Sequence, residues 1–141
     1  MKVEDGAIAA ENFRYVELAP RPLLPLIEET AQAVEQLQDI KAARKEHFVA
    51  LYLNARHELI HKELISIGTV NASIVHPRDV FAPAILHNAT AVIVAHNHPS
   101  GDATPSAEDR DVTHRLKEGG RLLGISVLDH IIITEYGYST L

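Results

Sequence analysis

The stretch AVIVAHNHPSGDATPSAED, residues 91–109, joins an apolar run to a polar turn and then to the start of a helix pattern. Its first five residues, Ala91 to Ala95, are all apolar, which predicts a strand covered on both faces of a sheet. Ser106 opens the helix pattern, which we expect to run to Glu118 and to stop at Gly119-Gly120. Since α/β sheets place their sites where a strand ends and a helix begins, we expect the chemistry of this chain in the turn between them.

The segments on either side continue the alternation of strands and helices. A helix is expected from Leu26 onward, because apolar residues recur every three or four positions and basic residues come late. The other expected elements are a strand over residues 48–53, a second strand ending near Ile67, a short helix opened by His76-Pro77-Arg78, and one or two strands within residues 125–134. This order predicts a three-layer α/β domain in which helices flank a mixed β-sheet.

The length of 141 residues suits one domain. Pro20, Pro22 and Pro25 mark a boundary, so we expect an N-terminal arm over residues 1–22 and a single domain over residues 23–141. No apolar stretch approaches the roughly 20 residues of a membrane span, and the first residues lack a signal-peptide pattern. We therefore expect a cytoplasmic protein that does not contact a membrane.

Charge and cysteine content narrow the possible chemistry. The net charge is −6 and no run of Lys or Arg is long, so direct binding to DNA should be weak or indirect. The absence of Cys excludes disulfide scaffolds, thiolate nucleophiles, iron–sulfur clusters and zinc sites that need sulfur. Metal sites built from His and carboxylates stay open, and the chain has nine His residues.

His96 and His98 form an H-x-H pair at the expected end of the strand. Side chains two apart in extended backbone lie on one face, with Cα atoms roughly 7 Å apart, so both rings can converge on one ion. The turn can fold Asp109 back toward them, and a water molecule would then complete a tetrahedral zinc site with an open position. Asp102 is an alternative ligand or the acceptor of an Asx turn.

Each half of this pattern also has a purely structural interpretation. Ser106 and Asp109 match the S-x-x-[DE] capping box, in which the two side chains satisfy backbone amides at a helix start. A histidine pair at a strand end can equally be a surface pair or a pair buried in the core. Only the occurrence of both patterns across one short turn favours a metal site.

The string HNHPSGDATPSAED over residues 96–109, with Glu63 upstream and Asp129-His130-Ile131-Ile132-Ile133 downstream, resembles the RadC branch of the JAB/MPN metalloenzymes. The signature of that family is Glu, then HxHP, then SxxD, and the resemblance spans about Phe48 to Ser139. It implies a JAB/MPN fold with one zinc ion per chain. The residue roles that it implies are zinc binding by His96, His98 and Asp109, general acid/base catalysis by Glu63, and help in holding the oxyanion by Ser106.

The residues themselves say less about Glu63 than about the histidine pair. Glu63 shares strand parity with Ile65 and Ile67, so an inward carboxylate among apolar neighbours is expected. Such a group could take a proton from water and later donate it to a leaving amine. The alternative is a solvated residue of the strand.

Other motifs compete with this interpretation. His57-Glu58-Leu59-Ile60-His61 satisfies HExxH, but that zinc motif needs a helix and this segment predicts a strand. The letters HNH at residues 96–98 are adjacent here, whereas HNH nucleases disperse these residues, and a zinc deaminase would need Cys. Asp129 or His130 could support a ligand histidine, while His114 is expected to be a solvated helix residue.

The expected function is zinc-dependent hydrolysis of a peptide or isopeptide bond in a protein or peptide substrate. One alternative is a scaffold with a non-catalytic metal site in a DNA repair or replication complex. Another is a metal-dependent phosphodiesterase. RadC-like proteins usually carry a further N-terminal helical region, and only a short arm and one helix precede the expected domain here. An association with DNA repair is therefore implied by the family resemblance alone.

Overall fold

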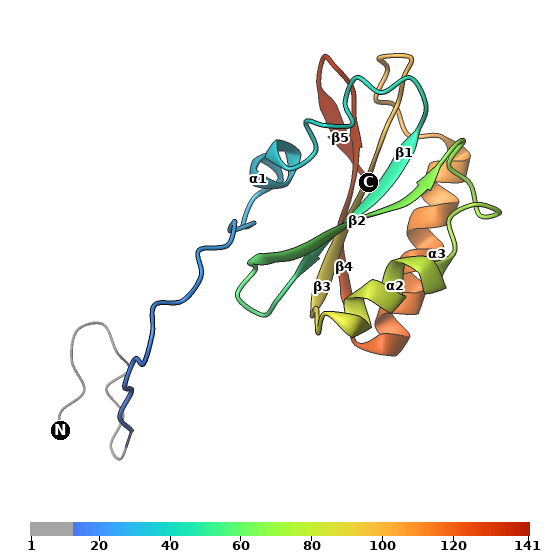
Figure 1. Cartoon of the computed structure of the whole chain (residues 1–141). Helices are drawn as coiled ribbons and strands as arrows, with labels where there is room; N and C mark the ends of the chain where they lie inside the picture. The colour runs from blue at the N-terminus through green and yellow to red at the C-terminus, as the bar shows by residue number, and fades with distance from the viewer. Residues whose placement is uncertain (1–12) are drawn as a thin grey trace.

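Five strands form one sheet in the computed structural model, which describes residues 13–141 (Figure 1). The strands are β1 (His47–Leu53), β2 (Leu59–Ile67), β3 (Ala91–Asn97), β4 (Ser126–Ile133) and β5 (Tyr138–Thr140). Their order in the sheet is β2-β1-β3-β4-β5, and only the β3–β4 pair is parallel. The sheet is therefore mixed, as expected.

Helices cover both faces of the sheet, so the predicted three-layer α/β fold is confirmed. Helices α2 (Pro77–Leu86) and α3 (Ala107–Leu123) lie together on one side, and α1 (Thr30–Glu35) lies on the other (Figure 1). All seven residues of β3 are buried, which agrees with the uninterrupted apolar run of the sequence. β3 is thus the central strand, and whatever follows its last residue is held on a rigid base.

The helix expected from Leu26 is shorter than the apolar pattern predicts. Regular α-helix covers only Thr30–Glu35, although Ile27, Leu37 and Ile40 are buried as the periodicity required. Beyond the helix, the amides of Leu37 and Ile40 donate to carbonyls three residues earlier, which is the tighter 3₁₀ spacing. Periodicity of three to four residues predicts the buried face correctly but does not distinguish these two hydrogen-bond spacings.

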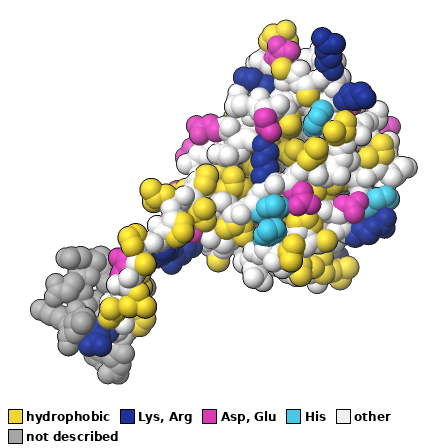
Figure 2. Space-filling model, viewed as in Figure 1, with side chains coloured by type: hydrophobic (Ala, Val, Ile, Leu, Met, Phe, Trp, Pro, Cys, Tyr) yellow, Lys and Arg dark blue, Asp and Glu magenta, His cyan; other side chains and the backbone are white. Residues whose placement is uncertain are grey.

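The expected arm is described only from Phe13 onward, and residues 1–12 lie outside the described part of the chain. Residues 13–26 are exposed and run away from the sheet as an extended segment that carries apolar side chains (Figure 2). Leu26 then pairs with Glu58, which lies in the turn between β1 and β2. Among residues 13–141, no helix has the length and apolar character needed to cross a membrane.

The expected helix stop at Gly119-Gly120 is wrong, because α3 continues to Leu123 and ends at Gly124 with a left-handed backbone, φ 71°. Gly120 instead allows a close approach: a Cβ there would lie 2.3 Å from the carbonyl oxygen of Ile125. The two glycines thus fit the helix against its neighbours, and the sequence could not distinguish this use from a stop signal.

Replacing Gly120 with Ala is expected to destabilise the fold by about 1–3 kcal/mol, as overpacking does. In an open helix the same change stabilises by about 1 kcal/mol, so the contact with Ile125 decides the sign. Chemical denaturation measures the effect. Gly137→Ala is the control, since nothing lies within 4 Å of its added Cβ. A Gly120→Ala variant as stable as the wild type would mean that the helix and the strand after it separate easily.

Candidate metal centre

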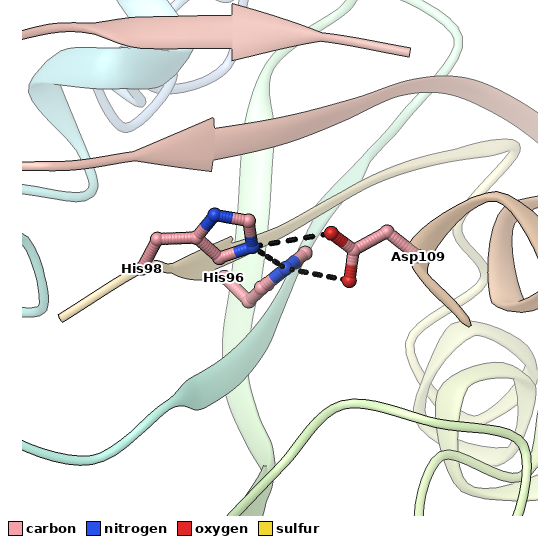
Figure 3. Close-up of side chains that lie close together, drawn as sticks. All are labelled: His96, His98 and Asp109. Carbon is pink, nitrogen blue, oxygen red and sulfur yellow. Dashed lines mark hydrogen bonds and ion pairs between the residues drawn. The ribbon is translucent and has the colours of Figure 1, made fainter. Parts of the chain in front are cut away.

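His96, His98 and Asp109 converge at the end of β3 (Figure 3). His96 lies in β3, His98 follows the strand directly, and Asp109 is in the first turn of α3. The His96 Nε2 atom lies 3.1 Å from His98 Nε2 and 3.1 Å from Asp109 Oδ1, and His98 Nε2 lies 3.1 Å from Asp109 Oδ2. One possible ligand atom from each of the three side chains therefore lies within 4.8 Å of the other two.

The turn between β3 and α3 holds this arrangement through backbone bonds. The His98 amide donates to the Ile133 carbonyl at 3.1 Å, and Gly101, with φ 87°, donates back to the His98 carbonyl at 3.1 Å. The positive φ explains a glycine at this position. Asp102 accepts from the Thr104 amide at 2.9 Å in an Asx turn, so its carboxylate is used within the turn.

Asp109 is both a capping residue and a neighbour of the two histidines. Its Oδ2 atom accepts from the Ser106 amide at 2.9 Å, while Ser106 Oγ accepts from the Asp109 amide at 3.0 Å. The capping box is therefore present, and it aims the carboxylate at the rings. Burial acts to raise the pKa of Asp109, but the closeness of its carboxylate to the His96 ring and to the Ser106 amide outweighs burial and holds the pKa well below the usual range.

The protonation of His98 can be deduced from its partner. Its Nδ1 atom lies 2.8 Å from the Asp102 carbonyl oxygen, which can only accept a hydrogen bond. Nδ1 therefore carries a hydrogen, and Nε2 is the nitrogen that faces Asp109. A ring held through Nδ1 in this way would offer Nε2 to a metal ion.

The donor set fits a tetrahedral zinc ion. With zinc–ligand bonds of about 2.0–2.1 Å, neighbouring ligand atoms of a tetrahedron lie about 3.3 Å apart. The two Nε2 atoms are 3.1 Å apart, and each lies 3.1 Å from one of the two Asp109 oxygens, which is close to this value. An ionised carboxylate and two imidazoles leave the fourth position open, as in catalytic zinc sites. Such a metal site can be proposed from these three residues, and other first-row metals share these ligands.

A pocket of about 550 Å³ lies beside two of the candidate ligands, His98 and Asp109. Its lining includes Glu46, Asn71, His98, Ser106 and Asp109. The pocket gives a substrate access to the fourth coordination position, and its lining adds an acidic side chain to the site.

That side chain is Glu46, which no motif in the sequence indicates. It directly precedes β1, whose second residue, Phe48, pairs with His96. Its Oε1 atom accepts from the Val70 amide at 3.1 Å, and its carbonyl accepts from Gly68 at 2.8 Å. The only signal in the sequence was an acidic residue just before a predicted strand, and the pairing of that strand with β3 was not visible.

The structure does not bring Glu63 into this pocket. Glu63 pairs with Ala50 of β1, whose partner in β3 is Val94, two residues before His96. The expectation of an inward, unpaired carboxylate is wrong, because the side chain is 42% exposed and its Oε1 atom lies 2.8 Å from His61 Nε2. Glu63 lines a different pocket, between β2 and α2.

In the described part of the chain, the residues of the competing motifs do not gather into a second site. His57 lies in a turn with φ 62° and His61 lies in β2, so HExxH does not form on a helix. Asn97 points away from the two histidines, accepting from the His47 amide at 2.7 Å. His114 is exposed beside Glu118, as expected.

His130 of β4 lies directly behind His96 and is fully buried. Its Nε2 atom is 2.8 Å from His96 Nδ1. Burial is the main cause that lowers the pKa of His130 to about 3, so the ring is neutral at physiological pH. This position agrees with the suggestion that His130 could support a ligand histidine.

Comparisons with known proteins find relatives that match most of this chain. The family model described as RadC-like JAB domain matches residues 27–141. A UPF0758 protein of Geobacillus sp. strain WCH70 is 49% identical over 92% of this chain and 54% of its own length. A UPF0758 protein of Methanosarcina mazei is 44% identical over 96% of this chain and 62% of its own length. The chain thus spans little more than half the length of these curated relatives.

Proposed function

Since the chain belongs to the RadC-like JAB domain family, we propose that it is a zinc-dependent hydrolase that cleaves a peptide or isopeptide bond. The observation that carries the proposal is the pocket that Glu46 and Ser106 line together with His98 and Asp109, two of the three candidate ligands. It combines a site for a metal ion, an acid/base and a hydrogen-bond donor with space for a substrate.

Zinc bound at this site would polarise the scissile carbonyl group and lower the pKa of a water molecule toward about 7. The position of Glu46 in the pocket favours its carboxylate as the proton carrier. Because the Val70 amide holds Oε1, Oε2 is the atom free to take a proton from water and later give it to the leaving amine. The acid/base role of Glu63 stays a prediction, and its pairing with His61 supports it less.

Ser106 is the proposed donor to the oxyanion. Its Oγ atom accepts from the Asp109 amide, and its hydroxyl hydrogen has no acceptor within residues 13–141. That hydrogen can therefore point into the pocket toward negative charge developing on the carbonyl oxygen.

A peptide or protein substrate suits the surface better than a nucleic acid. On the face shown in Figure 2, Lys and Arg side chains are scattered among acidic ones and form no continuous patch. The net charge of −6 also disfavours binding of a nucleic acid. Acidic side chains line the pocket itself at Glu46 and Glu108, and these would repel a phosphodiester.

Incubation of the zinc-loaded protein with a cell lysate should release new peptide termini or free lysine amines, detected by mass spectrometry. A chelator should abolish these products and added zinc should restore them, since the reaction needs the ion. The matched control is Glu46→Gln, which keeps the three ligands. Products that persist with the chelator would contradict the proposed function.

A further inference from the structure

A chain of three hydrogen bonds connects two of the candidate ligands on the side away from the pocket. His96 Nδ1 lies 2.8 Å from His130 Nε2, and His130 Nδ1 is hydrogen-bonded to Thr113 Oγ1. Thr113 Oγ1 in turn donates to the carbonyl oxygen of Asp109 at 2.9 Å. His96 and His130 are fully buried and Thr113 is 7% exposed, so water does not compete for these bonds.

The direction of the three hydrogen bonds follows from the acceptor at the end of the chain, the Asp109 carbonyl oxygen. The Asp109 carbonyl can only accept, so it takes the single hydroxyl hydrogen of Thr113. Thr113 Oγ1 must then accept from His130 Nδ1. With the ring hydrogen of His130 on Nδ1, its Nε2 atom can accept from His96 Nδ1. With its hydrogen on Nδ1, His96 can offer the Nε2 lone pair to an ion held with His98 and Asp109.

We propose that Thr113 and His130 are positioning residues that fix the protonation of His96 so that its Nε2 lone pair is presented to the metal ion. The inference rests on the proposed metal site and deepens it. His98 needs no such device, because a backbone carbonyl holds its Nδ1 hydrogen. The partner of His96 is another imidazole, which could donate as well as accept, so the hydroxyl of Thr113 decides the direction.

The reverse direction shows why this matters. If His130 carried its hydrogen on Nε2, it would donate to His96 Nδ1, and His96 would then carry its own hydrogen on Nε2. That hydrogen would stand between the ring and the ion. Partners of this kind change metal affinity by about 10- to 100-fold when they are removed.

The first test measures zinc affinity of the full chain by competition with a chelating dye. Thr113→Val keeps the shape of the side chain but removes the hydroxyl group, and we expect it to weaken zinc binding about 10-fold or more. Thr113→Ser restores the hydroxyl group and should restore affinity. The matched control is Thr134→Val, which removes another buried hydroxyl, bonded to the Gly137 carbonyl in the β4–β5 turn. Equal affinity of Thr113→Val and wild type would overturn the proposal.

The second test reads the ring hydrogens directly by long-range ¹H–¹⁵N correlation spectra of the histidines. In the zinc-loaded wild type, His130 should carry its hydrogen on Nδ1, and in Thr113→Val some or all of it should move to Nε2. A wild-type His130 protonated on Nε2 would overturn the proposal. If the wild type took up no zinc, the proposed function would fail, while the same spectra of the metal-free chain would still decide the direction of the bonds.

Discussion

Replacing Asp109 with Ala is expected to reduce the zinc content of the purified protein from about one ion per chain to nearly none. The carboxylate is the only acidic ligand of the candidate site, and its loss leaves two neutral imidazoles. The same change breaks the capping box at Ser106 and should lower the free energy of unfolding by about 1 kcal/mol. Metal analysis of the dialysed protein and chemical denaturation measure the two effects separately.

Matched variants separate metal binding from capping. Ser106→Ala removes the side-chain cap but keeps the carboxylate, so it should retain zinc. His57→Ala and His61→Ala should also retain zinc, because the HExxH residues are not gathered around one point. Retention of zinc by Asp109→Ala would mean that Asp109 only caps the helix, and loss of zinc in the two histidine variants would move the site to HExxH.

The Glu46→Gln variant is expected to bind zinc like the wild type and to lower turnover by about 10²-fold or more, the usual range for a positioned acid/base. Glutamine can still accept from the Val70 amide, so the start of β1 should keep its structure. The lysate products described above provide the substrate for the rate measurement. Glu58→Gln, in the β1–β2 turn, is the control and should leave turnover nearly unchanged.

The same measurement on Glu63→Gln decides between the two carboxylates. We expect a smaller effect than for Glu46→Gln, because Glu63 lies in another pocket and is paired with His61. If Glu63→Gln alone abolished turnover while keeping zinc, Glu63 would be the acid/base and the proposed role of Glu46 would be wrong. Loss of zinc in Glu46→Gln would make that carboxylate a ligand.

The parts of the site that the sequence predicts are those built from neighbouring residues. Side chains two apart on a strand share a face, which brought His96 and His98 together, and the spacing of Ser106 and Asp109 predicted the cap that aims the carboxylate. Continuous apolar character likewise predicted that β3 is buried on both faces.

The remaining parts depend on contacts between distant segments. Glu46 reaches the site only because β1 pairs with β3, and the sequence does not show which strands are neighbours. For Glu63, parity with Ile65 and Ile67 predicted an inward side chain, but the β1–β2 register shifts between Phe48 and Val49, and alternation does not continue through such an irregularity. The length of α3 was missed for the same reason, since Gly119 and Gly120 lie against Phe81 of α2.

The most direct test of the metal site is anomalous diffraction at the zinc absorption edge from crystals of the zinc-loaded protein. The arrangement of the three side chains predicts one peak per chain, about 2.0–2.2 Å from His96 Nε2, His98 Nε2 and an Asp109 carboxylate oxygen. A peak beside His57 and His61, or no peak within reach of His96 and His98, would contradict the proposed metal centre.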